Sequence, residues 1–146
     1  MAKHISNMNQ LQAALMPTMV KMVDELAERV YETLNYFLQE YYNSYDPKSY
    51  RRQYDFLRSA VKVEPKVTGN KVVASVYIDT DYMDNYYNAT GEQVAQWANW
   101  GLHGGLDVGN NTPHVWDDTM KETIGNGELL KLAVEYLKRK GFSVRN

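Results

Sequence analysis

The stretch VKMVDELAERVYETLNYFLQEY, residues 20–41, decides the fold of this chain of 146 residues. Its apolar residues recur at alternating spacings of three and four, which places them on one face of a helix. This stripe consists of Val20, Val23, Ala27, Val30, Leu34, Phe37 and Tyr41. The pattern predicts a long amphipathic helix. Pro17 fits its start, or a kink if the helix begins earlier, and we expect residues 1–16 to form a flexible segment.

The period changes to two after Ala60, which predicts a β-hairpin near residues 60–79. Gly69-Asn70 has the composition of a two-residue hairpin turn. The second strand gathers alternate apolar residues on one face: Val72, Ala74, Val76 and Ile78. Pro65 cannot donate a hydrogen bond to a sheet, so it predicts an edge position or a bulge in the first strand.

Shorter elements complete the predicted architecture. Asp46-Pro47 is expected to start a short helix or turn, and Thr90-Gly91-Glu92-Gln93 has the spacing of a capping box before another helix. Residues 101–113 are rich in glycine and lack a period, so we expect a mobile loop. A last helix is predicted to stop at Gly141.

These elements predict one α+β domain over residues 1–146. A long N-terminal amphipathic helix packs on a small antiparallel sheet, the hairpin near residues 60–79, and additional helices follow toward the C-terminus.

The composition limits the possible functions. The formal net charge of −2 does not favour nucleic-acid binding, since such domains are usually basic. The chain has no cysteine, which excludes disulfides and thiolate metal sites. The sequence has neither an apolar signal-peptide core nor an apolar run of about 18 residues. We expect a soluble intracellular domain without a membrane span.

Catalysis has one weak candidate in the sequence. His103 and His114, with Asp107, Asp117 and Asp118 nearby, could bind a divalent ion in a small metal hydrolase. The alternative is that they decorate a flexible loop and cap the helix that follows. No phosphate-binding loop, dinucleotide fingerprint or nucleophile elbow occurs. We expect no enzyme, no bound metal and no cofactor.

Charge is segregated along the chain. Basic residues gather between residues 48 and 71, and acidic residues gather between residues 79 and 118, where lysine and arginine are absent. Two oppositely charged regions suit head-to-tail association between copies, although they could also pair within one molecule. The charged residues expected at the interface are Lys48, Arg51, Arg52, Arg58, Asp79, Asp81 and Asp84.

Tyrosine is also concentrated, and protein interfaces are enriched in it. The aromatic residues expected at the interface are Tyr45, Tyr50, Tyr54, Tyr86 and Tyr87. An alternative function is a nucleic-acid-associated module that uses the Tyr/Arg-rich segment 41–58, because aromatic and basic side chains together bind single strands.

The stretch YYNSYDPKSYRR, residues 41–52, and FLRS, residues 56–59, resemble the head–tail joining or tail-completion family of long-tailed phages, in versions from Gram-positive hosts. The order of elements over residues 20–144 is also similar. The resemblance implies a virion structural protein of the neck, with the head–tail junction as its site and the host cytoplasm as its place of assembly.

The same resemblance implies the partners. The expected state is a homo-oligomeric ring, with six copies as the expected number, between the head–tail connector or adaptor and the tail tube or tail terminator proteins. Neither catalysis, a cofactor, a membrane nor direct nucleic-acid binding is implied.

Overall fold

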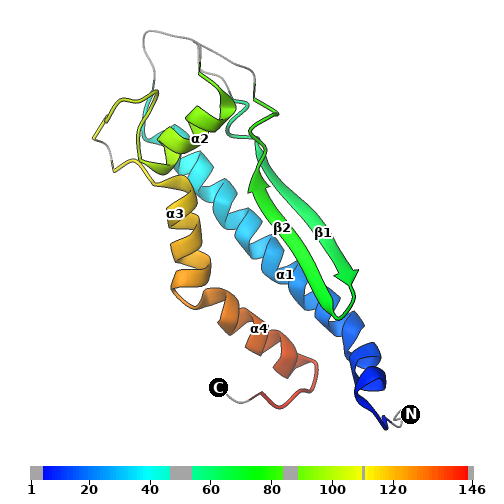
Figure 1. Cartoon of the computed structure of the whole chain (residues 1–146). Helices are drawn as coiled ribbons and strands as arrows, with labels where there is room; N and C mark the ends of the chain where they lie inside the picture. Colours follow the sequence, from blue (N-terminus) through cyan, green and yellow to red (C-terminus); the bar gives the residue numbers. More distant parts are fainter. Residues whose placement is uncertain (1–4, 47–53, 84–88, 110, 145–146) are drawn as a thin grey trace.

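The computed structural model describes residues 5–46, 54–83, 89–109 and 111–144, and it confirms the predicted α+β fold (Figure 1). In chain order its elements are α1 (Met8–Asn43), β1 (Ala60–Thr68), β2 (Lys71–Ile78), α2 (Gly91–Asn99), α3 (Val115–Met120), the π-helical turn η1 (Lys121–Gly125) and α4 (Glu128–Arg139). The expected helix start at Asp46-Pro47 extends into residues 47–53, which lie outside the described residues.

Helix α1 begins earlier than predicted. Asn7 caps it, since the Asn7 side chain accepts a hydrogen bond of 2.9 Å from the N–H of Gln10. The helix then continues through Pro17, so residues 8–16, expected to be a flexible segment, are helical. Proline leaves the carbonyl of Ala13 without its usual helical partner. Ala13 is exposed, and solvent can reach that carbonyl.

Helix α1 is buried on more than the predicted stripe. The stripe is buried or half-buried throughout, and Met22, Leu38 and Tyr42 are buried as well. The broader burial follows from the position of α1, which contacts β1 and β2 as well as α3, η1 and α4. Figure 1 shows the hairpin along one side of α1 and the chain from α3 to α4 along another.

The hairpin forms as predicted. Strands β1 and β2 pair antiparallel, with Ala60 opposite Ile78, and the register shifts between Val63 and Lys66, where Pro65 lies. Alternate β2 residues from Val72 to Ile78 are half-buried and those between them are exposed. One face of the hairpin therefore packs on α1, and the other points outward.

The termini of the later helices follow the expected chemistry. Thr90 and Gln93 form the predicted capping box at α2. After α4, Gly141 adopts a φ of 89°, and the N–H of Phe142 donates to the Leu137 carbonyl over 3.0 Å. This is a Schellman ending, and it confirms the predicted stop.

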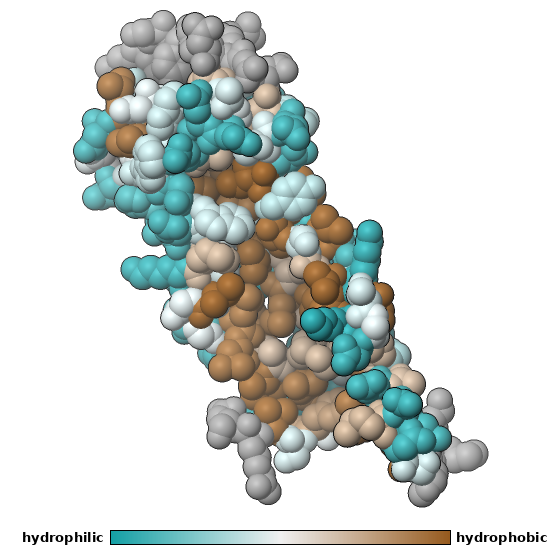
Figure 2. All heavy atoms as spheres, in the orientation of Figure 1, coloured by the Kyte–Doolittle hydropathy of each residue, from teal (hydrophilic) through white to brown (hydrophobic). Residues whose placement is uncertain are grey.

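The core is concentrated toward one end of the molecule. Leu34, Leu38, Ala98 and Val115 are fully buried and belong to one cluster. Of the buried residues of α1, only Met22 lies in its N-terminal half. Figure 2 shows apolar residues in a continuous band along the face of the molecule that it draws. No helix within the described residues combines the length and apolarity needed to cross a bilayer.

Candidate interface

The structure describes five of the predicted interface residues. Tyr45 is half-buried, while Tyr54, Arg58 and Asp81 are exposed and Asp79 is half-buried. The remaining predicted positions lie outside the described residues: Lys48, Tyr50, Arg51, Arg52, Asp84, Tyr86 and Tyr87.

The described basic and acidic candidates are neighbours within one molecule. The N–H of Asp79 donates to the carbonyl of Ser59 over 2.7 Å, so Asp79 lies beside the residue that follows Arg58. The Asp79 carboxylate also accepts hydrogen bonds from the N–H groups of Asp81 and Tyr82, at 3.1 and 3.3 Å. The structure therefore places Arg58 and Asp79 in one region, and does not separate them onto two opposed surfaces.

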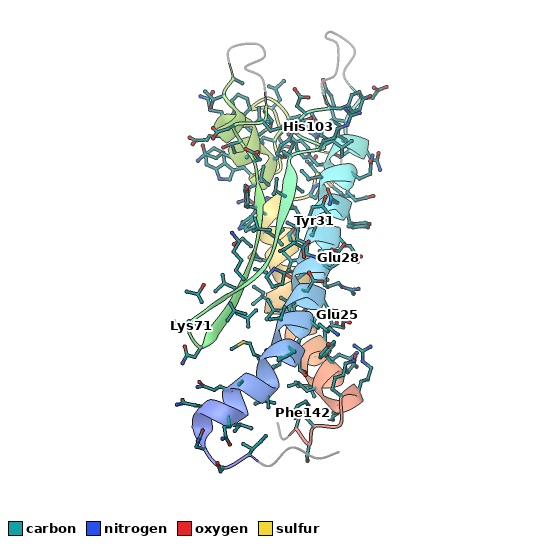
Figure 3. The ribbon with its side chains drawn as sticks, turned by 90° about the vertical axis from the view of Figure 1, so that its right-hand side faces the viewer. Glu25, Glu28, Tyr31, Lys71, His103 and Phe142 are labelled. Atoms are coloured by element: carbon teal, nitrogen blue, oxygen red, sulfur yellow. The ribbon has the colours of Figure 1, made fainter. Side chains whose placement is uncertain are left out.

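Lys62 of the basic segment is neutralised inside the molecule. Its Nζ lies 2.6 Å from Asp24 Oδ1 and 3.0 Å from Glu28 Oε2, and its side chain is 12% exposed. The hydrogen bond with Lys62 lowers the pKa of Asp24, and the bonds to Asp24 and Glu28 raise the pKa of Lys62 above its usual range. This contact ties β1 to α1, on which Figure 3 labels Glu28.

An aromatic cluster holds the C-terminal end of α1. Tyr41 and Tyr42 are buried, and both pack on Phe56, with ring centroids at 5.7 and 6.4 Å. Tyr54, which is 47% exposed, stacks on Tyr42 at 5.8 Å. Because Tyr41 and Tyr42 are in the core, they cannot stack on nucleic-acid bases. The Tyr/Arg-rich segment thus loses two of its aromatic residues as a candidate binding surface.

The two candidate metal-binding histidines have structural roles. His103 is buried against Tyr41, and its Nε2 lies 2.8 Å from Ser44 Oγ. His114 Nδ1–H donates to the carbonyl of Asn99 over 2.9 Å. Among the described residues, no three histidine or acidic side chains gather in a way that could hold a metal ion.

The predicted loop over residues 101–113 makes specific contacts that its composition does not suggest. His103 and Leu106 form an isolated antiparallel bridge, with N–H···O distances of 2.8 and 2.9 Å. Tyr41 Oη donates to the Leu102 carbonyl over 2.5 Å. These contacts attach the first part of the loop to α1, which the glycine content could not reveal.

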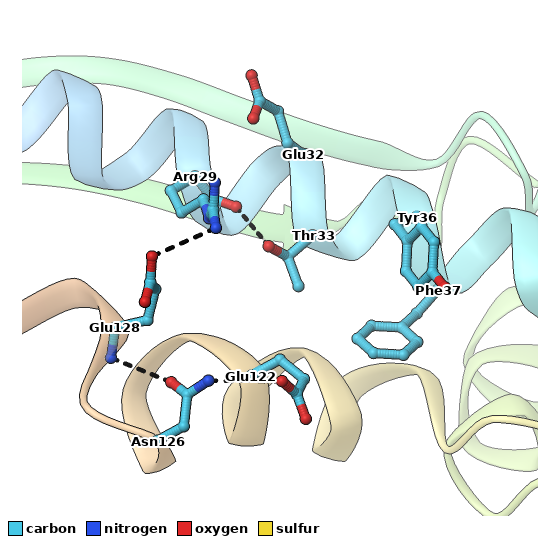
Figure 4. A pocket seen from close by; sticks show the side chains of 8 residues that line it. All are labelled: Arg29, Glu32, Thr33, Tyr36, Phe37, Glu122, Asn126 and Glu128. Carbon is cyan, nitrogen blue, oxygen red and sulfur yellow. Dashed lines mark hydrogen bonds and ion pairs between the residues drawn. The ribbon is translucent and has the colours of Figure 1, made fainter. Parts of the chain in front are cut away.

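A groove lies between α1 and the chain from η1 to α4 (Figure 4). Arg29 Nη2 crosses it to Glu128 Oε1 at 3.3 Å. The Asn126 side chain accepts a hydrogen bond of 3.0 Å from the Glu128 N–H at the start of α4. Glu32, Glu122, Tyr36 and Phe37 complete the lining with Thr33. The groove is acidic and open, and its described contacts join two helices.

Exposed apolar side chains are candidate contact residues that the sequence pattern did not single out. Met8 is 66% exposed on α1, Val73 and Tyr77 are 51% and 43% exposed on β2, and Leu130 is 72% exposed on α4. The uncharged run from Ile5 to Val20 was the available signal for the first of these. For β2, the sequence pattern already placed Val73 and Tyr77 on the face opposite to the half-buried residues Val72, Ala74, Val76 and Ile78.

The structure is that of a small α+β protein with apolar side chains exposed on α1, β2 and α4. Its sequence matches the YomN family over residues 7–139, and the chain belongs to that family. This family comprises the products of yomN genes similar to the one in Bacillus phage SPBc2. The chain is therefore related to a phage protein. Neither a curated protein nor a solved structure gave a match.

Proposed function

We propose that this YomN-family protein is a structural component of the phage virion at the head–tail junction. In this role it completes the neck or tail by forming a homo-oligomeric ring, for which six copies are the expected number. The ring docks on the connector or adaptor on one side and on the tail tube or terminator on the other. Assembly takes place in the host cytoplasm, and the proposal includes no catalytic step or cofactor.

The family match supports a phage origin. The observation that carries self-association is the exposed apolar surface on three separate elements. Leu11, Val73 and Leu130 come from α1, β2 and α4, and all three are exposed. Large exposed apolar patches mark protein contacts in soluble proteins. Few residues at the N-terminal end of α1 are buried, as expected if the subunit completes its core only on assembly.

The first test is the mass of the purified chain in solution, measured by light scattering over a range of protein and salt concentrations. We expect a discrete species several times heavier than the 16.9 kDa chain. Salt separates the two possible driving forces. A ring held by apolar contacts persists at high salt, whereas one held by the charged segments dissociates. A monomer under all conditions would contradict self-association.

A charge reversal tests the part of the proposal that rests on the basic segment. Arg51→Glu with Arg52→Glu should weaken assembly and leave the monomer folded if this segment binds a neighbouring copy. The matched control is Lys131→Glu with Lys138→Glu, which makes the same change in charge on α4. Unchanged assembly of the first variant would remove the basic segment from the interface.

A further inference from the structure

The hairpin carries an apolar patch on the face that points away from α1. Val61 pairs with Tyr77 across the strands, Val63 pairs with Ser75, and Val73 follows on the same face. Val73 and Tyr77 are 51% and 43% exposed. The outward face of a hairpin that covers a core is ordinarily polar. We call Val61, Val63, Val73 and Tyr77 the outer hairpin patch.

The helix that packs on the hairpin cannot cover this patch. Helix α1 runs without interruption from Met8 to Asn43 and lies against the other face of the hairpin, where Lys62 of β1 meets Asp24 and Glu28. Within the described residues the sheet has two strands. An apolar sheet face is stable when a second layer packs on it, and another molecule can supply that layer here.

The N-terminal end of α1 is an uncharged helix with exposed apolar side chains, which suits packing on an apolar sheet face. The first turns of α1, residues 8–16, project beyond the hairpin turn at Lys71, as Figures 1 and 3 both show. Within this N-terminal arm, Met8 is 66% and Leu11 36% exposed. The sequence from Ile5 to Val20 contains no charged residue. Burying the arm therefore removes no charge from water.

The arm and the outer hairpin patch match in size and charge. Residues 8–16 of a helix span about 12 Å, and Val73 to Tyr77 of a strand span about 14 Å. Lys66 and Lys71 lie on the outward face toward the hairpin turn, opposite Val73 and Thr68. The arm brings no positive charge to them, whereas a basic partner helix would be repelled.

We propose that the N-terminal arm of one copy packs on the outer hairpin patch of a second copy. The contact uses two different surfaces, so it is head-to-tail and can close into a ring. It rests on the self-association in the proposed function and names the surfaces that make it. The contact repeats on the outside of the hairpin the helix-on-sheet packing that α1 makes on the inside.

Two variants test this contact. The arm variant carries Met8→Lys and Leu11→Lys, and the patch variant carries Val73→Lys and Tyr77→Lys. All four side chains are exposed, so both variants should keep the wild-type circular dichroism spectrum and unfolding midpoint. The control is Ile124→Lys, because Ile124 is 60% exposed on η1 and belongs to neither surface.

The decisive measurement is the mass of the variants alone and mixed. At a concentration where the wild type and the control form oligomers, each variant should be a monomer. An equimolar mixture should form a one-to-one dimer, because the patch variant still has an intact arm and the arm variant an intact patch. That dimer cannot grow, since its remaining surfaces are the substituted ones.

Three results would overturn the inference. Wild-type assembly by both variants would exclude these surfaces while leaving self-association intact. Two monomeric variants that do not combine would mean that the arm and the outer hairpin patch do not bind each other. A wild type that stays monomeric at every concentration would overturn both the contact and the self-association on which it rests.

Discussion

The imidazole ring of His103 lies flat on the phenol ring of Tyr41, with 4.0 Å between their centroids and 7° between their planes. The Ser44 hydroxyl donates its proton to the Tyr41 carbonyl over 2.7 Å. The Nε2–H of His103 is therefore the donor to Ser44 Oγ. Through these contacts a loop residue becomes part of the core at the C-terminal end of α1.

Replacing His103 by alanine should lower the free energy of unfolding by about 2 to 4 kcal/mol, because it removes a buried ring and its hydrogen bond. His114→Ala is the matched control. His114 is exposed and makes one hydrogen bond to the Asn99 carbonyl, so its loss should cost about 1 kcal/mol. Urea unfolding followed by circular dichroism measures both, and equal losses would contradict a core role for His103.

Leu34→Ala should destabilise the fold by about 2 to 5 kcal/mol, since the truncation leaves a cavity at a buried site. Leu34 is 0% exposed and Leu130 is 72% exposed. Leu130→Ala makes the same chemical change at the surface, and its effect should stay within about 0.5 kcal/mol. The thermal unfolding midpoints of the two variants compare them directly. A small effect at Leu34 would mean that α1 packs differently from the structure.

Gly91→Ala should destabilise the protein although alanine favours helices. A Cβ at Gly91 would lie 2.1 Å from the carbonyl oxygen of Thr80, and this backbone atom cannot move aside freely. We expect a loss of about 1 to 3 kcal/mol from overpacking. At Gly125 the nearest atom to an added Cβ is 3.7 Å away. Gly125→Ala should thus be neutral or stabilising by about 0.4 to 1 kcal/mol, as denaturant midpoints would show.

The contact between Lys62 and Asp24 predicts a pH dependence of stability. Because the pKa of Asp24 is lowered in the folded state, its contribution is present above about pH 4, its unfolded value, and is lost as the pH falls through the folded pKa. The pKa of Lys62 is raised, so its contribution is present below about pH 10 and is lost only at still higher pH. The loss of the Asp24 contribution at acidic pH can therefore be measured, whereas the loss of the Lys62 contribution lies at a pH that is too high for a practical measurement.

Lys62→Gln should therefore raise the pKa of Asp24 toward its ordinary value and flatten the loss of stability below pH 4. The pKa is measured by NMR titration of the Asp24 side chain, and stability by urea midpoints from about pH 2 to 7. Lys66→Gln is the control, because Lys66 is exposed on the opposite face of β1. An Asp24 pKa that Lys62→Gln leaves unchanged would contradict the ion pair.

The elements with strong local signals were predictable. Three features depend only on residues that are close together in the sequence. They are the stripe from Val20 to Tyr41, the turn at Gly69-Asn70 and the capping box at Thr90. The pattern around Pro17 permitted two starts for α1, because proline fits the first turn of a helix or kinks a longer one. An exposed helix tolerates Pro17, and no local pattern reports that exposure.

The arrangement of the charged candidates was less predictable, because charge along a sequence does not give position in space. The segregated charges suggested two opposed surfaces, but β1 and β2 bring residues 58 and 79 to the same end of the hairpin. Lys62 was counted with the basic segment, and the structure pairs it with Asp24 and Glu28. Such pairs form between residues far apart in the chain.

The sequence by itself determined the elements of this protein, their order and which face of α1 and β2 turns inward. The physical reason is that helix and strand periodicity and capping act over a few residues. Only the tertiary structure decided that His103 joins the core beside Tyr41, that Lys62 is neutralised, and that Met8, Val73 and Tyr77 remain uncovered. Burial depends on what packs from elsewhere in the chain, and that information lies in long-range contacts.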